Sequence, residues 1–375
     1  MRVIALGGAG AMTQIAVKDL AGKKGVKELV IADYNIGAAE ALARGLGDKC
    51  SAKQIDANNH AELVDAIRGF DVALGGIGPF YKYEVKIAKA CLEARTPYVS
   101  LCDDSDAAAE VLKLDRDVAE AGLAMITGCG WTPGVTSVLA RKGAQGFDEI
   151  DEIAVAWGCH VGDTEGKAVT LHTTHIFTGN VPSYQRGREL MIPAGSDPKC
   201  VRFPEPVGEI TTYHVGHPEP VTIPRYIRAN TVTLRGGLVE GWLCQLARIA
   251  AKIRLTTTDR RNDVFGVIYN AVAPPVERFL DAFSHKETCS ACRVDLKGRA
   301  GNKSRNIIYG AAAHMNLLTG LPLSVAAQML LENKISQKGV MGPEACIDPD
   351  EFLRRLASGG ISFYEGDAMT ERLAV

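Results

Sequence analysis

Strand-like and helix-like segments alternate through the first third of the chain, and this alternation constrains the fold more than any other feature of the sequence. We expect strands at 2–6, 28–32, 52–55, 71–74, 98–101 and 123–126. Helical stretches lie between them, at 13–21, 38–46, 61–67, 81–94 and 106–121. A strand that returns to the same sheet through a helix forms a parallel neighbour. The pattern therefore predicts an α/β domain with a doubly wound parallel sheet.

The regular alternation of strand-like and helix-like segments ends after Gly134. Apolar residues then alternate with polar or small residues, as they do on half-buried strands, in three segments: 153–157, 210–215 and 294–296. Longer helical runs are interspersed with these strands, at 239–255 and 261–283. The length of 375 residues exceeds the size at which one hydrophobic core keeps growing. We therefore expect a second domain, of the α+β type with an open mixed sheet.

Composition and charge indicate a soluble chain that binds a small molecule. The longest stretch without a charged residue, 306–331, contains His314 and is split by 320–322, so we expect two short buried helices there and no membrane span. The first residues reach Gly7 too soon to supply the core of a signal peptide. A net charge of −2 offers no surface for nucleic acid or an anionic membrane. The ten cysteines are scattered, as reduced thiols are, and we expect a cytoplasmic protein.

A glycine-rich turn joins the first expected strand to the first expected helix. Gly8 allows a tight turn, and Gly10 lets backbone N–H groups approach a pyrophosphate at the helix N-terminus. Thr13 stands where the motif has its third glycine, so the helix should pack slightly farther from the sheet. The turn residues expected to bind the cofactor are Gly8, Ala9, Gly10, Ala11 and Met12. At the first turn of a six-strand pattern, this motif predicts a Rossmann domain that binds a dinucleotide.

Asp33 closes the second expected strand. A carboxylate there accepts hydrogen bonds from the adenosine ribose hydroxyls and repels a 2′-phosphate. Tyr34 and Asn35 follow it, and neither offers a positive charge to a phosphate. The residues therefore favour NAD over NADP. The alternative is that Asp33 is only the N-cap of the next helix.

Four further positions are expected near the cofactor. Asp56 closes the third strand and should lie near the adenine. Gly76 and Gly78 lie in the turn after the fourth strand, where glycine lets the backbone approach a ligand. Ser100 ends the fifth strand, and we expect the nicotinamide over this strand end and over Thr127, with the second domain closing on it.

At this point the chain resembles the saccharopine dehydrogenase-like oxidoreductases over nearly its whole length. The residues that carry the resemblance are Gly8-Ala9-Gly10 and the segments 90–94, 98–104, 128–134, 217–224 and 339–344. The resemblance implies a Rossmann domain at 1–134, an α+β substrate and dimerisation domain at 135–318, and a C-terminal segment, 319–375, that packs back on the Rossmann domain. It also implies hydride transfer between a nicotinamide and a carbon bearing an amine or imine. The segment 171–180 matches no one member of the family, so the substrate stays open.

Two acidic residues, Asp103 and Asp104, follow the fifth expected strand. An amine dehydrogenase needs a carboxylate to hold a substrate ammonium, or a base to remove its proton. We expect Asp103 to act in catalysis and Asp104 to bind substrate, and the alternative is that they cap the helix beginning near Asp106. Thr132, after the sixth strand, is also expected to contact substrate.

Four histidines cluster in the second domain: His172, His175, His214 and His217. Because histidine exchanges protons near neutral pH, His175 or His217 could be the acid/base. His172 and His175 could ligate a metal if they share a helical face, but no third ligand at suitable spacing accompanies them, and we expect no metal. Structural hydrogen bonding is the other alternative.

Arginines and cysteines complete the candidates. The arginines that could hold a substrate carboxylate in a bidentate fork are Arg186, Arg188, Arg225, Arg228 and Arg235. Of these we choose Arg225, together with Asn180 of the unmatched segment, as substrate contacts. Cys289 and Cys292 are interpreted as ordinary thiols, because a zinc site would need a second pair.

The leading hypothesis is an NAD(P)-dependent oxidoreductase that acts on a C–N bond of an amino acid. A lysine 6-dehydrogenase type and a saccharopine dehydrogenase type both remain open. The alternatives are a carboxynorspermidine-type polyamine-precursor dehydrogenase and a non-catalytic NAD(H)-binding regulatory protein. We expect a homodimer.

Overall fold

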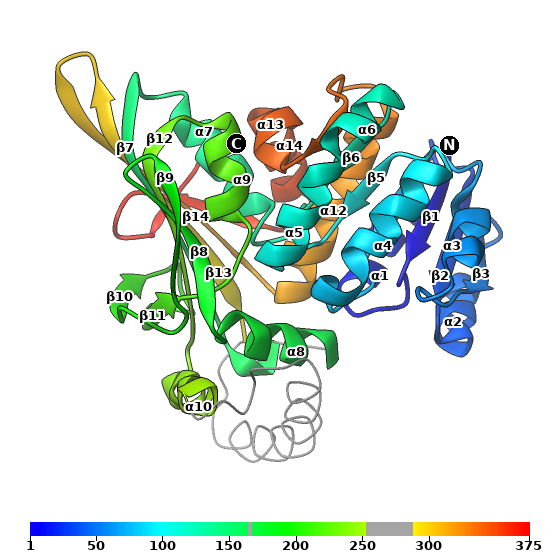
Figure 1. Ribbon diagram of the computed structural model, residues 1–375, viewed down its shortest axis with the longest axis horizontal. Coiled ribbons are helices and arrows are strands. Elements are labelled where there is room, and N and C mark those ends of the chain that lie inside the picture. The colour runs from blue at the N-terminus through cyan, green and yellow to red at the C-terminus, as the bar shows by residue number, and fades with distance from the viewer. Residues whose placement is uncertain (164–166, 253–287) are drawn as a thin grey trace. The chain divides into compact units, whose positions relative to one another are not determined.

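The computed structural model describes residues 1–163, 167–252 and 288–375 (Figure 1). They divide into two compact units: a first unit of residues 1–138 and 316–359, and a second unit of residues 139–315 and 360–375. The sequence had led us to place 319–375 as a whole with the Rossmann domain. The structure assigns 360–375 to the second unit, because strand β16 (Ser362–Glu365) pairs there with β14 (Lys303–Ala313). The expected helix at 261–283 lies outside the described residues.

The first unit contains the expected doubly wound parallel sheet, which confirms the α/β prediction. Its seven strands run in the order β15-β6-β5-β4-β1-β2-β3, and all neighbours are parallel. The strands are β1 (Arg2–Leu6), β2 (Glu28–Asp33), β3 (Cys50–Gln54), β4 (Val72–Gly75), β5 (Tyr98–Ser100), β6 (Ala124–Ile126) and β15 (Gly339–Met341). The strand order reverses between β1 and β4, and ligands of such sheets bind at this point, outside the carboxyl ends of the strands. The seventh strand, β15, comes from the C-terminal part of the chain.

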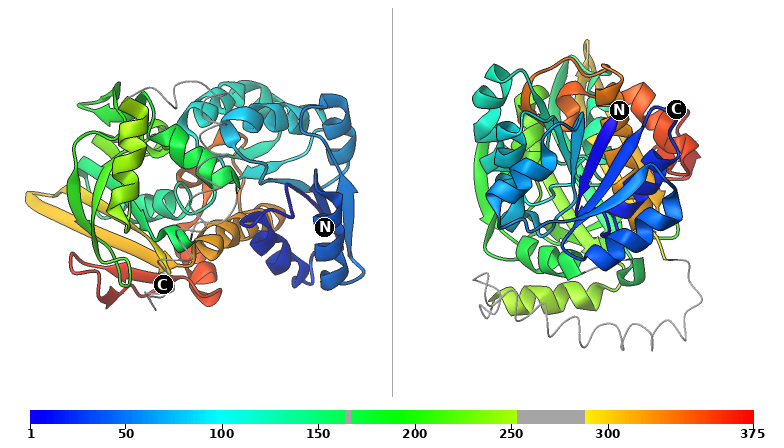
Figure 2. Two further views of the ribbon diagram at one scale, coloured as in Figure 1. Left: turned by 90° about the horizontal axis from the view of Figure 1, so that it is seen from below. Right: turned by 90° about the vertical axis from the view of Figure 1, so that its right-hand side faces the viewer.

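Helices of the first unit lie on both faces of this sheet, and the right-hand view of Figure 2 shows the strands between them. They are α1 (Thr13–Ala21), α2 (Ile36–Leu46), α3 (His60–Ile67), α4 (Phe80–Glu93), α5 (Ser105–Val111), α6 (Asp115–Glu120), α12 (Met315–Leu331), α13 (Pro343–Cys346) and α14 (Pro349–Ser358). The single helix expected over 106–121 is interrupted by a 3₁₀ turn, Leu112–Leu114, which separates α5 from α6.

The expectation of two short helices within 306–331 is wrong. The first part of this stretch belongs to β14, because it pairs along its length with β13 (Ser290–Ala300). The second part is the one helix α12, which continues through Pro322. An interior proline removes a helical hydrogen bond. Residues 320–327 are all buried, however, so tertiary packing holds the helix together through the proline.

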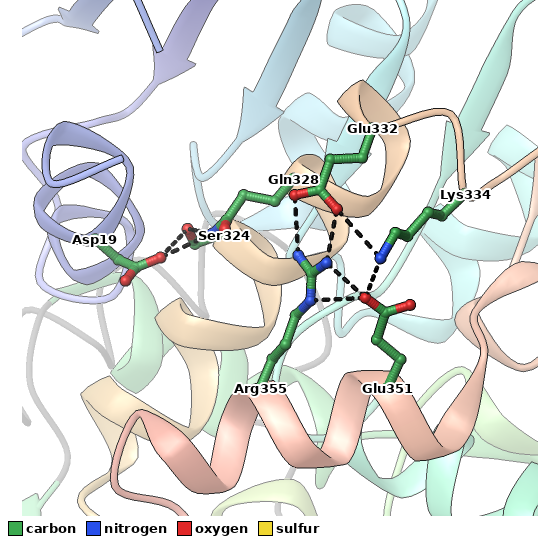
Figure 3. A network of polar contacts seen from close by, with 7 residues as sticks. All are labelled: Asp19, Ser324, Gln328, Glu332, Lys334, Glu351 and Arg355. Atoms are coloured by element: carbon green, nitrogen blue, oxygen red, sulfur yellow. Dashed lines mark hydrogen bonds and ion pairs between the residues drawn. The ribbon is translucent and has the colours of Figure 1, made fainter. Parts of the chain in front are cut away.

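Polar contacts hold α12 against α1, and α14 against the residues that directly follow α12 (Figure 3). The residues of this network are Asp19, Ser324, Gln328, Glu332, Lys334, Glu351 and Arg355. The Asp19 carboxylate of α1 accepts hydrogen bonds from Ser324 Oγ at 2.6 Å and from Gln328 Nε2 at 2.9 Å. Arg355 of α14 donates to both carboxylate oxygens of Glu332, at 3.2 and 2.6 Å. The C-terminal segment is thereby fixed to the first helix of the unit.

The second unit is built on a mixed sheet, as expected. Its main path runs β10-β11-β12-β7-β13-β14-β16-β17, and β8 joins β12 and β9 beside it. The pair β12–β7 is parallel and the other pairs are antiparallel. The remaining strands are β7 (Glu149–Cys159), β8 (Asn180–Gln185), β9 (Arg188–Pro193), β10 (Lys199–Arg202), β11 (Glu209–His214), β12 (Ala229–Leu238) and β17 (Glu371–Arg372).

In the described part of the second unit, four helices accompany this sheet: α7 (Val135–Ala144), α8 (Lys167–Ile176), α9 (Glu219–Tyr226) and α10 (Gly241–Lys252). The chain passes from the first unit to the second within α7. One core cluster of the unit contains Phe203, Val207 and Ile210 with Ala156 and Ala291 from neighbouring strands. Among the residues that the structure describes, no helix has both the length and the apolar character needed to span a bilayer.

Candidate functional site

The glycine turn between β1 and α1 has the geometry of a phosphate cradle. Gly7, with φ +72°, takes the left-handed conformation in this turn. A Cβ at Gly8 would lie 2.9 Å from the carbonyl oxygen of Ala5, so this position must also be glycine. At Gly10, the described atoms within 4 Å of an added Cβ are only the Gly7 oxygen and Thr13 Oγ1. The glycines thus keep side chains away from the N-terminus of α1, which is where such a turn binds a pyrophosphate.

Thr13 is accommodated by a glycine on the opposite side. It is the first residue of α1 and is fully buried. A Cβ at Gly76, in the turn after β4, would lie 2.9 Å from both Cβ and Cγ2 of Thr13 and would overlap its hydroxyl. The larger side chain at the third motif position therefore takes the room that Gly76 leaves. Gly78 lies in the same turn and precedes a cis proline, Pro79.

Asp33 is tied to the glycine turn. Its Oδ2 accepts a hydrogen bond from the backbone N–H of Ala9 at 3.1 Å, and its Oδ1 accepts one from that of Asn35 at 3.0 Å. The N-cap of α2 is Asn35, whose side chain accepts from Ala38 N, so the reading of Asp33 as a helix cap is wrong. Tyr34 is 74% exposed beside it. The carboxylate thus lies at the end of β2, next to the cradle.

Asp56 lies two residues past β3. Its Oδ1 accepts hydrogen bonds from the backbone N–H of Asn58 at 2.9 Å and from the side-chain amide of the same residue at 3.1 Å. This local turn fixes the loop at the end of β3. Asp56 itself is half-buried.

A buried carboxylate that the sequence analysis missed lies at the ends of β5 and β6. Glu84 of α4 has no exposed surface and accepts hydrogen bonds from Ser100 Oγ at 2.6 Å, Tyr98 Oη at 2.9 Å and Thr127 Oγ1 at 3.3 Å. Burial raises the pKa of Glu84 to about 7, and the three hydroxyl donors oppose this shift. Ser100 is itself fully buried, so its hydroxyl faces Glu84. The signal in the sequence was a glutamate on the apolar stripe of a helix, at position 84 with 87, 88 and 91.

The two acids after β5 face different surroundings. Asp104 is fully buried, and its Oδ2 accepts a hydrogen bond from the backbone N–H of Tyr81 at 2.9 Å, so it caps the N-terminus of α4. It also occupies the N-cap position of α5, but its side chain makes no capping bond there. Asp103 is half-buried. Thr132, expected to contact substrate, is buried and precedes a cis proline, Pro133.

The second unit brings two of its histidines together. His172 of α8 and His217, just before α9, approach with Nε2–Nε2 at 3.3 Å and rings edge to face, their centroids 5.0 Å apart. The His217 ring also lies 5.8 Å from that of Trp157. For two imidazole nitrogens to bond, one must donate and the other accept, so the pair shares a proton. His217 is 3% exposed, whereas His172 is half-buried.

The other expected residues of the second unit differ in their burial. His175 is half-buried on α8, while Asn180 and Arg225 are exposed. Arg186, Arg188 and Arg228 are exposed as well.

Arg235 and His214 form a structural pair. Arg235 is buried, donates to His214 Nε2 at 2.9 Å and forms an ion pair with Asp197 at 3.1 Å. Burial and the neighbouring guanidinium lower the pKa of His214. The alternative of structural hydrogen bonding thus holds for His214. Cys289 is half-buried and Cys292 is buried, and within the described residues neither belongs to a disulfide.

The comparisons with known proteins match both parts of the chain. Residues 3–126 match the saccharopine dehydrogenase NADP binding domain, and residues 130–361 match the saccharopine dehydrogenase C-terminal domain. Carboxynorspermidine synthase of Vibrio alginolyticus is 23% identical, over 97% of this chain and 96% of its own length. Carboxyaminopropylagmatine dehydrogenase of Synechocystis sp. is 22% identical, over 97% of this chain and 98% of its own.

A solved structure shares the fold. Saccharopine dehydrogenase (L-Glu forming) from Saccharomyces cerevisiae superposes with a TM-score of 0.69 at 14% identity, covering 98% of this chain and 100% of that one. Together with the two domain matches and the cofactor cradle, this fold confirms the family resemblance. The chain belongs to the saccharopine dehydrogenase family and is an NAD(P)-dependent dehydrogenase that acts on amine groups.

Proposed function

We propose that the protein interconverts a carboxylated amine of the polyamine-precursor type with its imine, using NAD as the hydride carrier. The observation that carries this proposal is the match along almost the full lengths of two relatives named for carboxylated polyamine-type compounds, carboxynorspermidine and carboxyaminopropylagmatine. Lysine and saccharopine are the second candidates, because the family as a whole is named for saccharopine. Both candidates share a chemistry in which an amine and a carboxylate occur in one molecule.

The residues around Asp33 support NAD as the cofactor, although the description of the matching domain names NADP. The nearest strand neighbour of Asp33 on β3 is Gln54, and Tyr34 follows it along the chain. Neither side chain can neutralise a 2′-phosphate, whereas the Asp33 carboxylate would repel one. The carboxylate is also held in place by the cradle through Ala9. This arrangement suits the hydroxyls of an unphosphorylated adenosine ribose.

The polar groups of the two units support roles in amine chemistry. Asp103 is proposed to hold the substrate ammonium, since the other acid of the pair, Asp104, is buried and caps α4. His217 is proposed as the acid/base, with His172 as the neighbour that shares its proton. An amine must lose a proton before hydride can leave its carbon, and an imidazole near neutral pH can take that proton. The nicotinamide supplies or accepts the hydride when it is bound.

A substrate panel tests the proposal. Purified protein is incubated with NAD or NADP and with carboxynorspermidine, carboxyaminopropylagmatine, saccharopine or lysine, and formation of the reduced cofactor is followed by absorbance. We expect one of the two polyamine-type compounds to be oxidised fastest, with NAD. Norspermidine and aminopropylagmatine, which lack only the added carboxylate, are the matched controls and should react far more slowly. Preferential oxidation of lysine or saccharopine would refute the polyamine-precursor assignment and leave the enzyme class intact.

A further inference from the structure

A buried carboxylate lies behind the strand ends of the first unit. Glu84 stands at the start of the second turn of α4, and the hydroxyls of Tyr98, Ser100 and Thr127 all lie within hydrogen-bonding distance of it. Ser100 is the last residue of β5, and Thr127 directly follows β6. We call these four residues the Glu84 cluster. The cluster therefore borders the carboxyl ends of β5 and β6.

The cluster also reaches the end of β4. Although Tyr98 is the first residue of β5, its hydroxyl lies beside Gly75, the last residue of β4, because a Cβ at Gly75 would overlap it. The ligand of a doubly wound sheet binds outside these strand ends, across the point where the strand order reverses. Asp33 assigns the adenosine half of the cofactor to the β2 side. The nicotinamide half then belongs to the side of β4, β5 and β6.

Glu84 is the group of this cluster that changes its charge near neutral pH. Its pKa is about 7 because of burial, opposed by the hydroxyl donors and supported by nearby Asp104. The pKa values of Cys91, Tyr98 and Cys102 are raised well above their ordinary range by burial and by Glu84, so these groups stay neutral. None of the groups that shift the pKa of Glu84 is a cation. Within the part of the chain that the structure describes, an ionised Glu84 is therefore held by hydroxyl dipoles and not by an ion pair.

We propose that Glu84 is a positioning residue that sets how strongly the cofactor site prefers the oxidised nicotinamide over the reduced one. The oxidised ring carries a positive charge that the reduced ring lacks, so a carboxylate behind the strand ends attracts only the oxidised form. Glu84 has no exposed surface and acts through its field across the strand ends. The inference rests on the nicotinamide-binding part of the proposed function and is independent of the substrate.

Binding of the two cofactor forms tests this inference without any substrate. The dissociation constants of NAD⁺ and NADH are measured between pH 6 and pH 8.5, by calorimetry and by cofactor fluorescence, and the phosphorylated pair replaces them if it binds more tightly. In the wild type, the affinity for NAD⁺ relative to NADH should rise about three- to tenfold over this range as Glu84 ionises. In E84Q the ratio should not change with pH. E93Q, at the exposed end of the same helix, is the matched control and should behave like the wild type.

Two further variants make the test independent of how well E84Q folds. Y98F removes one donor to the carboxylate, so the pH at the midpoint of the change should rise. D104N removes the neighbouring charge and should keep the pH dependence. A ratio that does not change with pH in the wild type, an equal change in E84Q, or an unchanged midpoint in Y98F would overturn the inference. If neither cofactor form binds the wild type, the cofactor assignment itself fails, and this result is distinct from binding with a constant ratio.

Discussion

The contact between Thr13 and Gly76 allows a stability prediction worked from the structure. Thr13 is buried, and a Cβ at Gly76 would meet its Cβ and Cγ2 at 2.9 Å. Gly76 is not among the glycines with positive φ, so the backbone tolerates alanine and the steric clash decides the outcome. Overpacking of this kind costs about 1–3 kcal/mol. In a folding unit of this size we expect G76A to lower Tm by roughly 3–10 °C.

A double-mutant cycle separates this clash from other effects of the substitution. T13A removes two of the three clashing atoms, Oγ1 and Cγ2, and keeps Cβ. Alone it should cost about 1 kcal/mol, because it deletes a buried methyl and hydroxyl group. In T13A/G76A only the Cβ contact at 2.9 Å remains, so the alanine at 76 should cost clearly less than it does in G76A, a non-additivity of about 1 kcal/mol. Thermal unfolding of the four proteins, followed by circular dichroism, provides the values. A Tm of G76A equal to that of the wild type would refute the predicted clash. So would a loss of unfolding free energy in T13A/G76A that equals the sum of the losses in the two single variants.

Three further predictions address the cofactor, the acid/base and the pH dependence of stability. D33S combined with Y34R should shift the ratio of NADH to NADPH affinity toward NADPH, measured by fluorescence titration, and an unchanged ratio would contradict the role of Asp33. H217A should lower turnover roughly a hundredfold while its NADH affinity stays within twofold of the wild-type value, and wild-type turnover in this variant would exclude His217 as the acid/base. G10V should instead abolish NADH binding, because the valine side chain fills the cradle. Because the pKa of Glu84 is raised from 4.5 to about 7, the wild type loses stability as the pH rises through 7. E84Q should gain about 2–3 kcal/mol relative to it between pH 5 and pH 8 in urea unfolding, and parallel pH profiles would contradict this.

The first unit was predictable to a large extent because its signals are local. Strand β1 and helix α1 have the expected bounds, since buried apolar runs and a glycine turn fix both ends. Strand pairing between residues far apart in the sequence could not be predicted from local signals of this kind. Residues 306–313 are rich in alanine and suit a helix as well as a strand, and their partner β13 decides the outcome. The return of 360–375 to the second sheet depends on β14 in the same manner.

The residues of the candidate site were predictable only where they belong to a sequence motif of known chemistry. The glycine turn and Asp33 belong to such a motif, and the structure joins them through Ala9. His172 and His217 are 45 positions apart, and no spacing rule connects them. Glu84 was visible as a charge on an apolar stripe, but its hydroxyl partners come from two other segments of the chain. Which residues contact one another in the folded protein could not be predicted here from composition or from sequence spacing.

Deuterium transfer tests most directly the central claim that hydride moves between the nicotinamide and a carbon bonded to nitrogen. The amine that reacts in the substrate panel is oxidised by the protein, an excess of reduced cofactor carrying deuterium at both C4 positions is added, and the re-formed amine is analysed by mass spectrometry and NMR. The account predicts one deuterium per re-formed molecule, on a carbon attached to nitrogen. Re-formed amine without deuterium, or with deuterium on a carbon that bears no nitrogen, would contradict it.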